Sequence, residues 1–345
     1  MTSALSRQLK SPPDVTHYSA RRQVSMSGVL LLLLLLLSIA SLLLGAKTIS
    51  PTDVWLSLTG QLQNADSVIV VDARLPRTIA GILAGLALGG AGAVIQALTR
   101  NPLADPGILG VNAGASFAIA VGISLFGVSG MTGWLGFAWG GALLASLAVW
   151  LIGSPGGGRG NPVRLTLAGV ALTAVLAGMT SSLTLLNPQT FDQMRIWQAG
   201  TLDIRSLSHV RLVAPAIVAG CLLALVSARA LNNLSMGEEM AAALGTRVVL
   251  IRLLAVVAVM LLCGSTTALV GPIGFVGLMI PHVARWWFGS DQRWILIASF
   301  LLAPVLLLAA DIVGRLLVPG ELRVSVVTAF IGAPVLIWLV RQRKH

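Results

Sequence analysis

The residues best suited to chemistry are arginines beside long apolar segments. Arg74 and Arg77 stand in an Arg-Leu-Pro-Arg sequence at the start of one such segment, and Arg315 follows Asp311 by four positions near the end of another. A guanidinium group binds a carboxylate through two parallel hydrogen bonds, so Arg74 and Arg77 suit the docking of an acidic partner protein. Two other interpretations stay open. Arg74 and Arg77 can contact lipid headgroups, and Asp311 and Arg315 can neutralise each other on one helix face.

The sequence contains no recognisable catalytic or metal-binding pattern. A phosphate-binding loop of the form G-x-x-x-x-G-K-[ST] is absent, because the only lysines are Lys10, Lys47 and Lys344. The four histidines are far apart, and none has a ligand partner three or four residues further on. The two cysteines, Cys221 and Cys263, lie in separate apolar segments and form no disulfide or metal pattern. We therefore expect no bound metal, no cofactor and no enzymatic activity.

Composition places most of the chain in a lipid bilayer. Of its 345 residues, 56% are hydrophobic and only 10% are charged, and the mean hydropathy is +0.90. Soluble domains carry about 25% charged residues, and a membrane span needs about 20 mainly apolar residues. The sequence therefore predicts an all-α polytopic membrane protein with about ten transmembrane helices. The predicted spans are 28–46, 75–97, 108–127, 133–153, 164–186, 209–229, 248–270, 273–288, 293–314 and 324–340.

The distribution of positive charge predicts the orientation of the chain. The net charge is +11, but the bases are scattered among the loops and form no patch of the kind that nucleic acid binds. An even number of spans puts both termini on one side. Placing that side in the cytoplasm puts 15 Lys and Arg residues inside and 8 outside. Cytoplasmic loops usually carry this excess, so both termini are predicted to be cytoplasmic.

The chain is predicted to form a single domain. Residues 1–27 are polar and predict a cytoplasmic N-terminal tail, whereas residues 28–343 form the transmembrane domain. The first apolar run, 28–46, follows basic residues as in a signal peptide. Its 19 residues exceed the apolar core of a signal peptide, which is about 7–15 residues long, and no clear cleavage site follows. We interpret it as an uncleaved first helix.

Two loops on the predicted cytoplasmic side stand out. In the longer one, Ser235 and Glu238 form an S-x-x-E capping box, and Gly245 can end the helix that the box would start. A short surface helix rich in Met and Ala needs a partner to cover it. The other loop, residues 100–107, contains two prolines and a glycine, which stiffen it. It is either a tight turn or a constriction at the inner mouth.

Small residues gather inside the predicted spans. The second span contains Gly81, Gly85, Gly89, Gly90 and Gly92. Small residues let helix backbones approach closely in lipid, so we interpret these glycines as packing positions first and as the lining of a pathway second. Residues 106–110 weakly resemble residues 274–277, and each segment follows a long span of opposite direction. Inverted repeats in transporters have this arrangement.

With these segments in view, the sequence resembles the FecCD-type permeases of the ABC importers for iron siderophores and vitamin B12, from about residue 28 to residue 343. The matching motifs are RLPR at 74–77, NPLADPG at 101–107, LAGV at 167–170, ALG at 243–245, GFVGL at 274–278, PH at 281–282, AD at 310–311 and GAPV at 332–335. Segments 112–117, 197–205 and 318–325 resemble members of the family that carry a ferric enterobactin-type chelate.

The resemblance implies a type II ABC importer permease fold in the bacterial inner membrane and a role for each unusual segment. It implies that Arg74, Arg77 and Arg315 meet acidic residues of a periplasmic siderophore-binding protein. The implied coupling helix, within residues 235–247, docks on a cytoplasmic ATP-binding subunit through Ser235, Met236, Gly237, Glu238, Glu239, Ala243, Leu244, Gly245 and Arg247. The implied cytoplasmic gate comprises Asn101, Pro102 and Leu103 together with Pro162 and Val163. At the last two positions, relatives such as the vitamin B12 permeases carry small hydroxyl residues.

The resulting hypothesis is a permease subunit that moves a ferric siderophore by alternating access. It would act beside a second permease subunit, either a related chain or a second copy, while separate subunits hydrolyse ATP. Nucleotide can drive this change only through different contacts with the two states. Alternative cargoes are another iron chelate, haem or vitamin B12. An ion-gradient carrier, a channel or a membrane enzyme is disfavoured, because the spans lack the buried acids and the converging catalytic groups that these would need.

Overall fold

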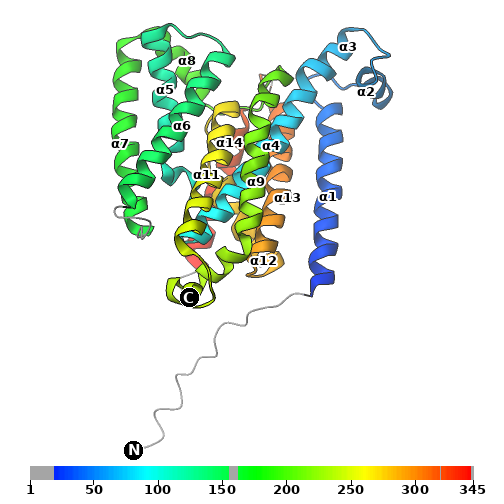
Figure 1. The fold of residues 1–345 in the computed structure, drawn as a ribbon. Helices are drawn as coiled ribbons and strands as arrows, with labels where there is room; N and C mark the ends of the chain where they lie inside the picture. Colours follow the sequence, from blue (N-terminus) through cyan, green and yellow to red (C-terminus); the bar gives the residue numbers. More distant parts are fainter. Residues whose placement is uncertain (1–18, 155–161, 319, 343–345) are drawn as a thin grey trace, which may run out of the picture.

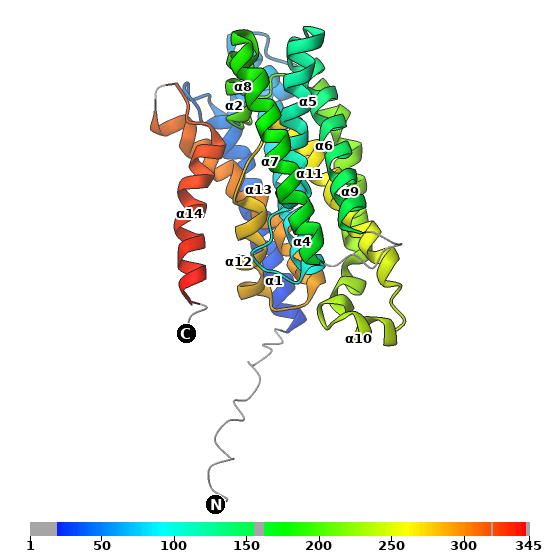
Figure 2. The same ribbon diagram turned by 90° about the vertical axis from the view of Figure 1, so that its left-hand side faces the viewer.

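The computed structural model describes residues 19–154, 162–318 and 320–342, and its regular elements there are helices (Figure 1). The long helices stand side by side with loops at two ends, and α1 begins at the end where α14 finishes (Figures 1 and 2). The elements are α1 (Ala20–Leu43), α2 (Pro51–Leu58), α3 (Ala65–Val68), the π-helical turn η1 (Ile69–Arg74), α4 (Leu75–Thr99), the 3-10 turn η2 (Pro106–Leu109), α5 (Val111–Phe126), α6 (Met131–Gly153), α7 (Pro162–Leu186), α8 (Pro188–Gln198), α9 (Leu207–Ser235), α10 (Glu238–Ala243), α11 (Val248–Val270), α12 (Val276–Phe288), α13 (Gln292–Leu317) and α14 (Val324–Gln342).

Each predicted span corresponds to a helix in the part of the chain that the structure describes. Seven helical stretches there are long and apolar enough to cross a membrane, and α5 and α14 contain shorter apolar stretches. The span predicted at 273–288 is only the 13-residue helix α12. A span requires about 20 residues, so α12 crosses only part of the bilayer.

The first helix starts earlier than the sequence predicts. α1 begins at Ala20, and the side chain of Ser19 accepts the N–H of Arg22 at its start. Residues 20–27 therefore belong to a helix and not to the tail predicted at 1–27. Residues 1–18 of that tail lie outside the described residues.

Two helices at the outer end are absent from the sequence prediction. α2 begins at Pro51 after Ser50, whose hydroxyl accepts the N–H of Asp53 at 3.1 Å. α8 begins at Pro188 after Asn187, which caps it in the same way. A capping residue followed by proline is a local signal for a helix start. Both helices lie at the upper end of Figure 1, α2 beside α3 at the right and α8 beside α5 and α7 at the left.

α4 is the central helix of the bundle. Every residue from Ala87 to Leu98 is buried, and the helix contacts α9, α11, α12 and α13. In the apolar stretches of α1 and α7, only 11% of the residues are buried inside the protein. The core of the protein therefore forms around α4, with α1 and α7 at the periphery.

Glycines let neighbouring backbones touch α4. A Cβ atom at Gly85 or Gly89 would collide with the backbone of α13, and one at Gly92 would collide with the backbone of Gly277 in α12. Close approach of this kind is typical of small residues in membrane helices. The interpretation of these glycines as packing positions is confirmed.

Two irregular segments, 100–110 and 271–275, end against α4 and against each other. A Cβ atom at Gly277 would lie 2.9 Å from the ring of Pro106, and Gln96 of α4 donates a hydrogen bond to the carbonyl oxygen of Leu278 at 3.0 Å. Lipid offers no hydrogen bonds to the backbone, so irregular segments persist at membrane depth only inside protein. The two segments whose sequences resemble each other thus meet in the interior.

Gly92→Ala should lower the stability of the folded protein, because the added methyl group must displace the backbone of Gly277. Overpacking of this kind typically costs about 1–3 kcal/mol. The measurement is the midpoint of thermal unfolding in detergent. Gly136→Ala is the matched control, since nothing lies within 4 Å of a Cβ at that position of α6. Equal midpoints for the two variants would contradict the packing role of Gly92.

Candidate functional site

The outer end of the protein carries a buried cluster of charges. Arg77 donates hydrogen bonds to the carboxylate of Asp311 from Nε, at 3.1 and 3.0 Å, and from Nη2 at 2.9 Å. Its Nη1 donates to Glu321 at 2.7 Å. Arg315 lies one turn after Asp311 on α13, with 3.2 Å between its Nε and Oδ2 of Asp311. The predicted Asp311–Arg315 pair is confirmed, and Arg77 binds the same carboxylate.

Two arginines also satisfy the carbonyl groups at the end of α1. Arg315 donates from Nη1 to the carbonyl oxygens of Ser41 and Leu44, each at 3.0 Å, and from Nη2 to the hydroxyl of Ser41 at 2.9 Å. Arg74 donates to the carbonyl oxygens of residues 42 and 43, at 2.7 and 2.8 Å. The last carbonyl groups of a helix lack partners within it, and cations there also suit the helix dipole. The arginines thus join the end of α1 to α4 and α13.

Burial limits how the predicted docking residues can act. Arg74, Arg77 and Arg315 are 5%, 7% and 6% exposed, and each donates hydrogen bonds within the protein. In the single chain they present little guanidinium surface to another protein. Their docking role stays a prediction, and the structure adds a role in holding three helices together.

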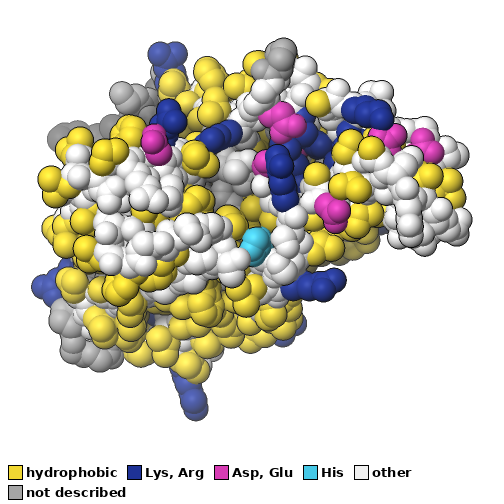
Figure 3. All heavy atoms as spheres, turned by 90° about the horizontal axis from the view of Figure 1, so that it is seen from above, with side chains coloured by type: hydrophobic (Ala, Val, Ile, Leu, Met, Phe, Trp, Pro, Cys, Tyr) yellow, Lys and Arg dark blue, Asp and Glu magenta, His cyan; other side chains and the backbone are white. Residues whose placement is uncertain are grey.

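Other basic side chains of the outer face are exposed. The side chain of Arg205 is 78% exposed, and 3.4 Å separates its Nη2 from Oδ2 of Asp203. Arg205 and Lys47 line a cavity of about 230 Å³, which we call the outer cavity. The outer cavity is also lined by Arg74, Arg77 and Arg315. Figure 3, which looks down on this end, shows basic and acidic side chains gathered on one part of it.

Sequence reasoning does not identify two partners of the buried arginines. Glu321 lies 244 positions after Arg77, and Ser41 lies 274 positions before Arg315. Neither residue has a local motif that indicates its partner. Only the packing of α1, α4 and α13 brings these groups together.

At the opposite end, α10 is shorter than the predicted coupling helix and begins differently. Its N-cap is Gly237, with a φ of 112° and no capping side chain. Ser235 remains the last residue of α9, and its hydroxyl donates to the carbonyl oxygen of Asn232 at 2.7 Å. The predicted capping box of Ser235 and Glu238 is therefore wrong. Helical backbone continues through Ser235 and directs its hydroxyl back to the preceding turn.

The coupling segment presents an exposed apolar surface. The side chains of Met236, Met240 and Leu244 are each more than half exposed. Gly245 follows the helix with a φ of 78°, as its predicted role at the helix end requires. The segment lies at the lower end of Figures 1 and 2, where α1 begins and α14 ends. Its contact with an ATP-binding subunit stays a prediction.

The predicted gate residues lie at the same end, after α4 and at the start of α7. Asn101 closes the turn after α4, because its Oδ1 accepts the N–H of Leu103 at 3.0 Å. Pro162 and Val163 are the first residues of α7, and α4 and α7 contact each other. The two segments are therefore on neighbouring helices, and their function as a gate stays a prediction.

The loop that continues from this turn is held by its own side chains. Oδ1 of Asp105 accepts the N–H of Gly107 at 2.7 Å at the start of η2. Burial raises the pKa of the Asp105 carboxyl above its ordinary value, and the hydrogen bond from Gly107 opposes this shift. These contacts make the loop a fixed turn and not a flexible connection.

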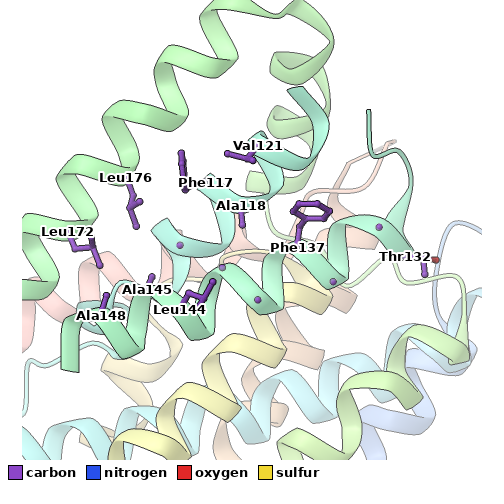
Figure 4. Close-up of a pocket in the computed structure, with 15 residues that line it drawn as sticks. Phe117, Ala118, Val121, Thr132, Phe137, Leu144, Ala145, Ala148, Leu172 and Leu176 are labelled. Atoms are coloured by element: carbon purple, nitrogen blue, oxygen red, sulfur yellow. The ribbon is translucent and has the colours of Figure 1, made fainter. Parts of the chain in front are cut away.

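A cavity of about 780 Å³ lies between α5, α6 and α7 (Figure 4). Figure 4 shows Phe117 of α5, Phe137 of α6 and Leu176 of α7 around it. None of its fifteen lining residues is charged. The hydroxyl of Thr132 lies 3.0 Å from Nε2 of His209, in hydrogen-bond contact. The cavity offers van der Waals contact and is poorly suited to recognise a charged group.

The described residues contain no candidate metal centre. Among them, no three His, Cys, Asp or Glu side chains are close enough to hold a metal ion. Cys221 of α9 and Cys263 of α11 are free thiols.

The relatives found by comparison with known proteins are named as permease proteins of transport or import systems. The family model of the FecCD transport family matches residues 32–342. The chain is 58% identical to the ferric enterobactin transport system permease protein FepD of Escherichia coli over 325 residues, which cover 94% of the chain and 97% of that protein. It is 37% identical to the iron(3+)-hydroxamate import system permease protein FhuB of Bacillus subtilis, covering 91% and 82%. It is 35% identical to the hemin transport system permease protein HmuU of Yersinia pestis, covering 93% and 96%.

Solved structures share the fold. A metal-chelate type ABC transporter in an inward-facing conformation matches with a TM-score of 0.80 and 26% identity, over 92% of this chain and 99% of that chain. PsaBC from Streptococcus pneumoniae matches with a TM-score of 0.56 and 14% identity, over 76% and 89%, which shows the fold alone. The predicted all-α permease fold is confirmed.

Asp311→Asn should strongly destabilise the protein, because it leaves Arg77 and Arg315 buried beside a neutral amide. Removing one partner of a buried ion pair typically costs about 3–5 kcal/mol. Thermal unfolding in detergent measures the effect. The control is Asp192→Asn, whose partner Arg195 is 71% exposed, and exposed pairs contribute at most about 1 kcal/mol. A loss for Asp311→Asn no larger than the control's would show that the cluster does not hold the outer end together.

Proposed function

We propose that this chain, which belongs to the FecCD transport family, is the permease subunit through which an ABC importer carries ferric enterobactin across the bacterial inner membrane. The observation that carries the proposal is the 58% identity to FepD, a ferric enterobactin permease, over 94% of the chain. The identity extends over nearly the whole length, so it includes the transmembrane helices and the loops between them. The chain is a multi-pass transport subunit and not an enzyme.

The choice of cargo follows from the order of the relatives and from the chemistry of the chelate. Relatives named for hydroxamate and hemin transport are 37% and 35% identical, well below the ferric enterobactin permease. Enterobactin-type chelates are bulky anions in which the iron is already coordinated. A permease for such a cargo needs no metal-ligating side chains of its own. A different siderophore, haem or vitamin B12 is the alternative cargo.

The mechanism that we propose is alternating access between two permease subunits, the second being a related chain or another copy of this one. A periplasmic siderophore-binding protein delivers the chelate at the outer end. Cytoplasmic ATP-binding subunits contact α10 and, by binding and hydrolysing ATP, close one mouth and open the other. Nucleotide can shift the two states only by contacting them differently, and the exposed Met236, Met240 and Leu244 are the apolar surface available for that contact.

We place docking of the binding protein over the outer cavity. The guanidinium groups of Arg74, Arg77 and Arg315 lie with the buried carboxylate of Asp311 and the exposed carboxylate of Glu321, so together they keep one net positive charge. Arg205 lines the same cavity, and because its pair with Asp203 is exposed, an acidic partner can compete for it. In this arrangement Arg205 makes the first contact, and the buried arginines contribute their charge from below.

Cells that lack this protein should fail to take up iron-55 bound to enterobactin, and a plasmid copy should restore uptake. Uptake of iron-55 bound to a hydroxamate siderophore, measured in parallel, is the control and should not depend on the plasmid. Rescue of the hydroxamate alone would keep the permease function and replace the cargo. Normal uptake of both chelates in the deletion strain would contradict the permease function as well as the proposed cargo.

Arg205→Glu should weaken binding of the loaded binding protein to the permease by about tenfold, equivalent to about 1.4 kcal/mol. The loss should shrink as salt is raised, because exposed charges are screened. Surface plasmon resonance on permease complexes in nanodiscs measures it. Arg211→Glu is the matched control, since Arg211 is exposed at the start of α9 and does not line the outer cavity. Equal affinities for both variants would exclude docking over Arg205.

A further inference from the structure

Glu238 bridges three helices at the predicted cytoplasmic end. It is the first residue of α10, and its Oε1 accepts a hydrogen bond from Nη2 of Arg252 on α11. The same oxygen lies 3.8 Å from Nη2 of Arg100, directly after α4. One carboxylate thus faces two guanidinium groups from different helices.

Arg252 sits where several helices end. It is 8% exposed and lines a small cavity with Leu98 of α4, Trp150 of α6 and Leu165 of α7. A buried guanidinium group is costly unless it is paired and hydrogen-bonded. Because Glu238 supplies a carboxylate to it, the first turn of α10 is tied to the place where α4 ends and α7 begins.

Arg100 stands directly before the predicted gate turn. It ends α4 with a φ of 53°, a left-handed conformation that is uncommon for residues other than glycine. Together with Glu238, Met236 and Met240 it lines a cleft of about 570 Å³ beside α10. A subunit seated on the exposed methionines would therefore lie directly over the contact between Arg100 and Glu238.

We propose that Glu238 is a positioning residue that transmits movement of α10 to both predicted gate segments. It acts through Arg100 on the turn of residues 101–103, and through Arg252 on the start of α7. This inference rests on the proposed function, in which α10 contacts the ATP-binding subunit and the two segments close the cytoplasmic mouth. The inference identifies Glu238, Arg100 and Arg252 as the side chains that connect α10 to the two predicted gate segments.

The two contacts of Glu238 respond differently to movement. The hydrogen bond from Arg252 to Glu238 joins the first turn of α10 to the start of α11, so the start of α11 follows α10. The contact with Arg100 is exposed on both sides, at 42% and 40%, and its 3.8 Å length leaves room to tighten. Exposed pairs form and break readily. Movement of α10 therefore carries α11 along and changes the contact beside the gate turn.

The first test uses the complete transporter in proteoliposomes, with its ATP-binding subunits and binding protein. Glu238→Gln keeps the size of the side chain and removes its charge. The number of chelates taken up per ATP hydrolysed should fall by about tenfold, within the range typical of coupling between sites. Co-purification of the ATP-binding subunits with Glu238→Gln shows whether such a fall reflects lost coupling or lost assembly. Asp192→Asn, which removes an acid from an exposed ion pair on α8, is the matched control and should keep the wild-type ratio.

The second test follows the gate segments themselves. Leu103→Cys and Val163→Cys, both at exposed positions, are made separately in a parent chain that carries Cys221→Ser and Cys263→Ala. Labelling by a water-soluble maleimide is compared with and without a non-hydrolysable ATP analogue. In the two single-cysteine chains that keep Glu238 and Arg100, nucleotide should change the labelling rate. Glu238→Gln should abolish both changes, whereas Arg100→Gln should abolish only the change at Leu103→Cys.

The outcomes distinguish failure of the proposed role of Glu238 from failure of the proposed transport function. If the single-cysteine chains that keep Glu238 and Arg100 show neither ATP-driven uptake nor nucleotide-dependent labelling, the proposed function is overturned, and the proposed role of Glu238 with it. If nucleotide changes the labelling rates equally with and without Glu238→Gln, only the proposed role of Glu238 is overturned. If Glu238→Gln fails to assemble, Arg100→Gln decides, since Arg100 is 42% exposed and its loss leaves no buried charge. A nucleotide-dependent change in labelling at Leu103→Cys that persists in Arg100→Gln would then overturn the proposal.

Discussion

Hydrocarbon offers no hydrogen bonds to a polypeptide backbone, and this constraint determines how the chain is arranged. The irregular segments 100–110 and 271–275 would be costly against lipid. They are accommodated because α4 is buried along its inner half and because its glycines let other backbones lie against it. The predicted gate turn continues directly from α4, and α12 begins where the second irregular segment ends beside Gly92. The position of the predicted gate turn thus follows from the packing of one helix.

The same constraint acts at the outer end, where guanidinium groups satisfy the last carbonyl groups of α1. Arg74 and Arg315 serve this structural purpose and also line the outer cavity. The charges of these arginines therefore hold α1 against α4 and α13 and also contribute to the electrostatic potential that a docking partner would meet. Substitution of a buried arginine changes both properties at once, so a loss of transport in such a variant does not identify which one failed. Arg205, which lies outside the cluster, separates them.

Features that depend on local sequence were predictable, and features that depend on distant contacts were not. Apolar length located the spans, and residue size identified the packing glycines of α4. The partners of Arg77 lie 234 and 244 positions away, and no local pattern indicates them. Ser235 has the correct spacing for a capping box, but extension of α9 competes with it and the longer helix prevails. The capped starts of α2 and α8, by contrast, were present in the sequence as local signals.

α1 is fastened at both ends by residues that are synthesised long after it. Near its start, Gln23 donates to the carbonyl oxygen of Phe288 at 2.7 Å, and near its end Ser41 receives hydrogen bonds from Arg315. During translation α1 precedes α12 and α13, so these two contacts form only after those helices have been inserted. Before then, the end of α1 can be held by Arg74 and Thr78 but not yet by Arg315, and its start lacks the contact with Phe288. The first helix of the bundle thus reaches its final set of contacts only when the last third of the chain has been made.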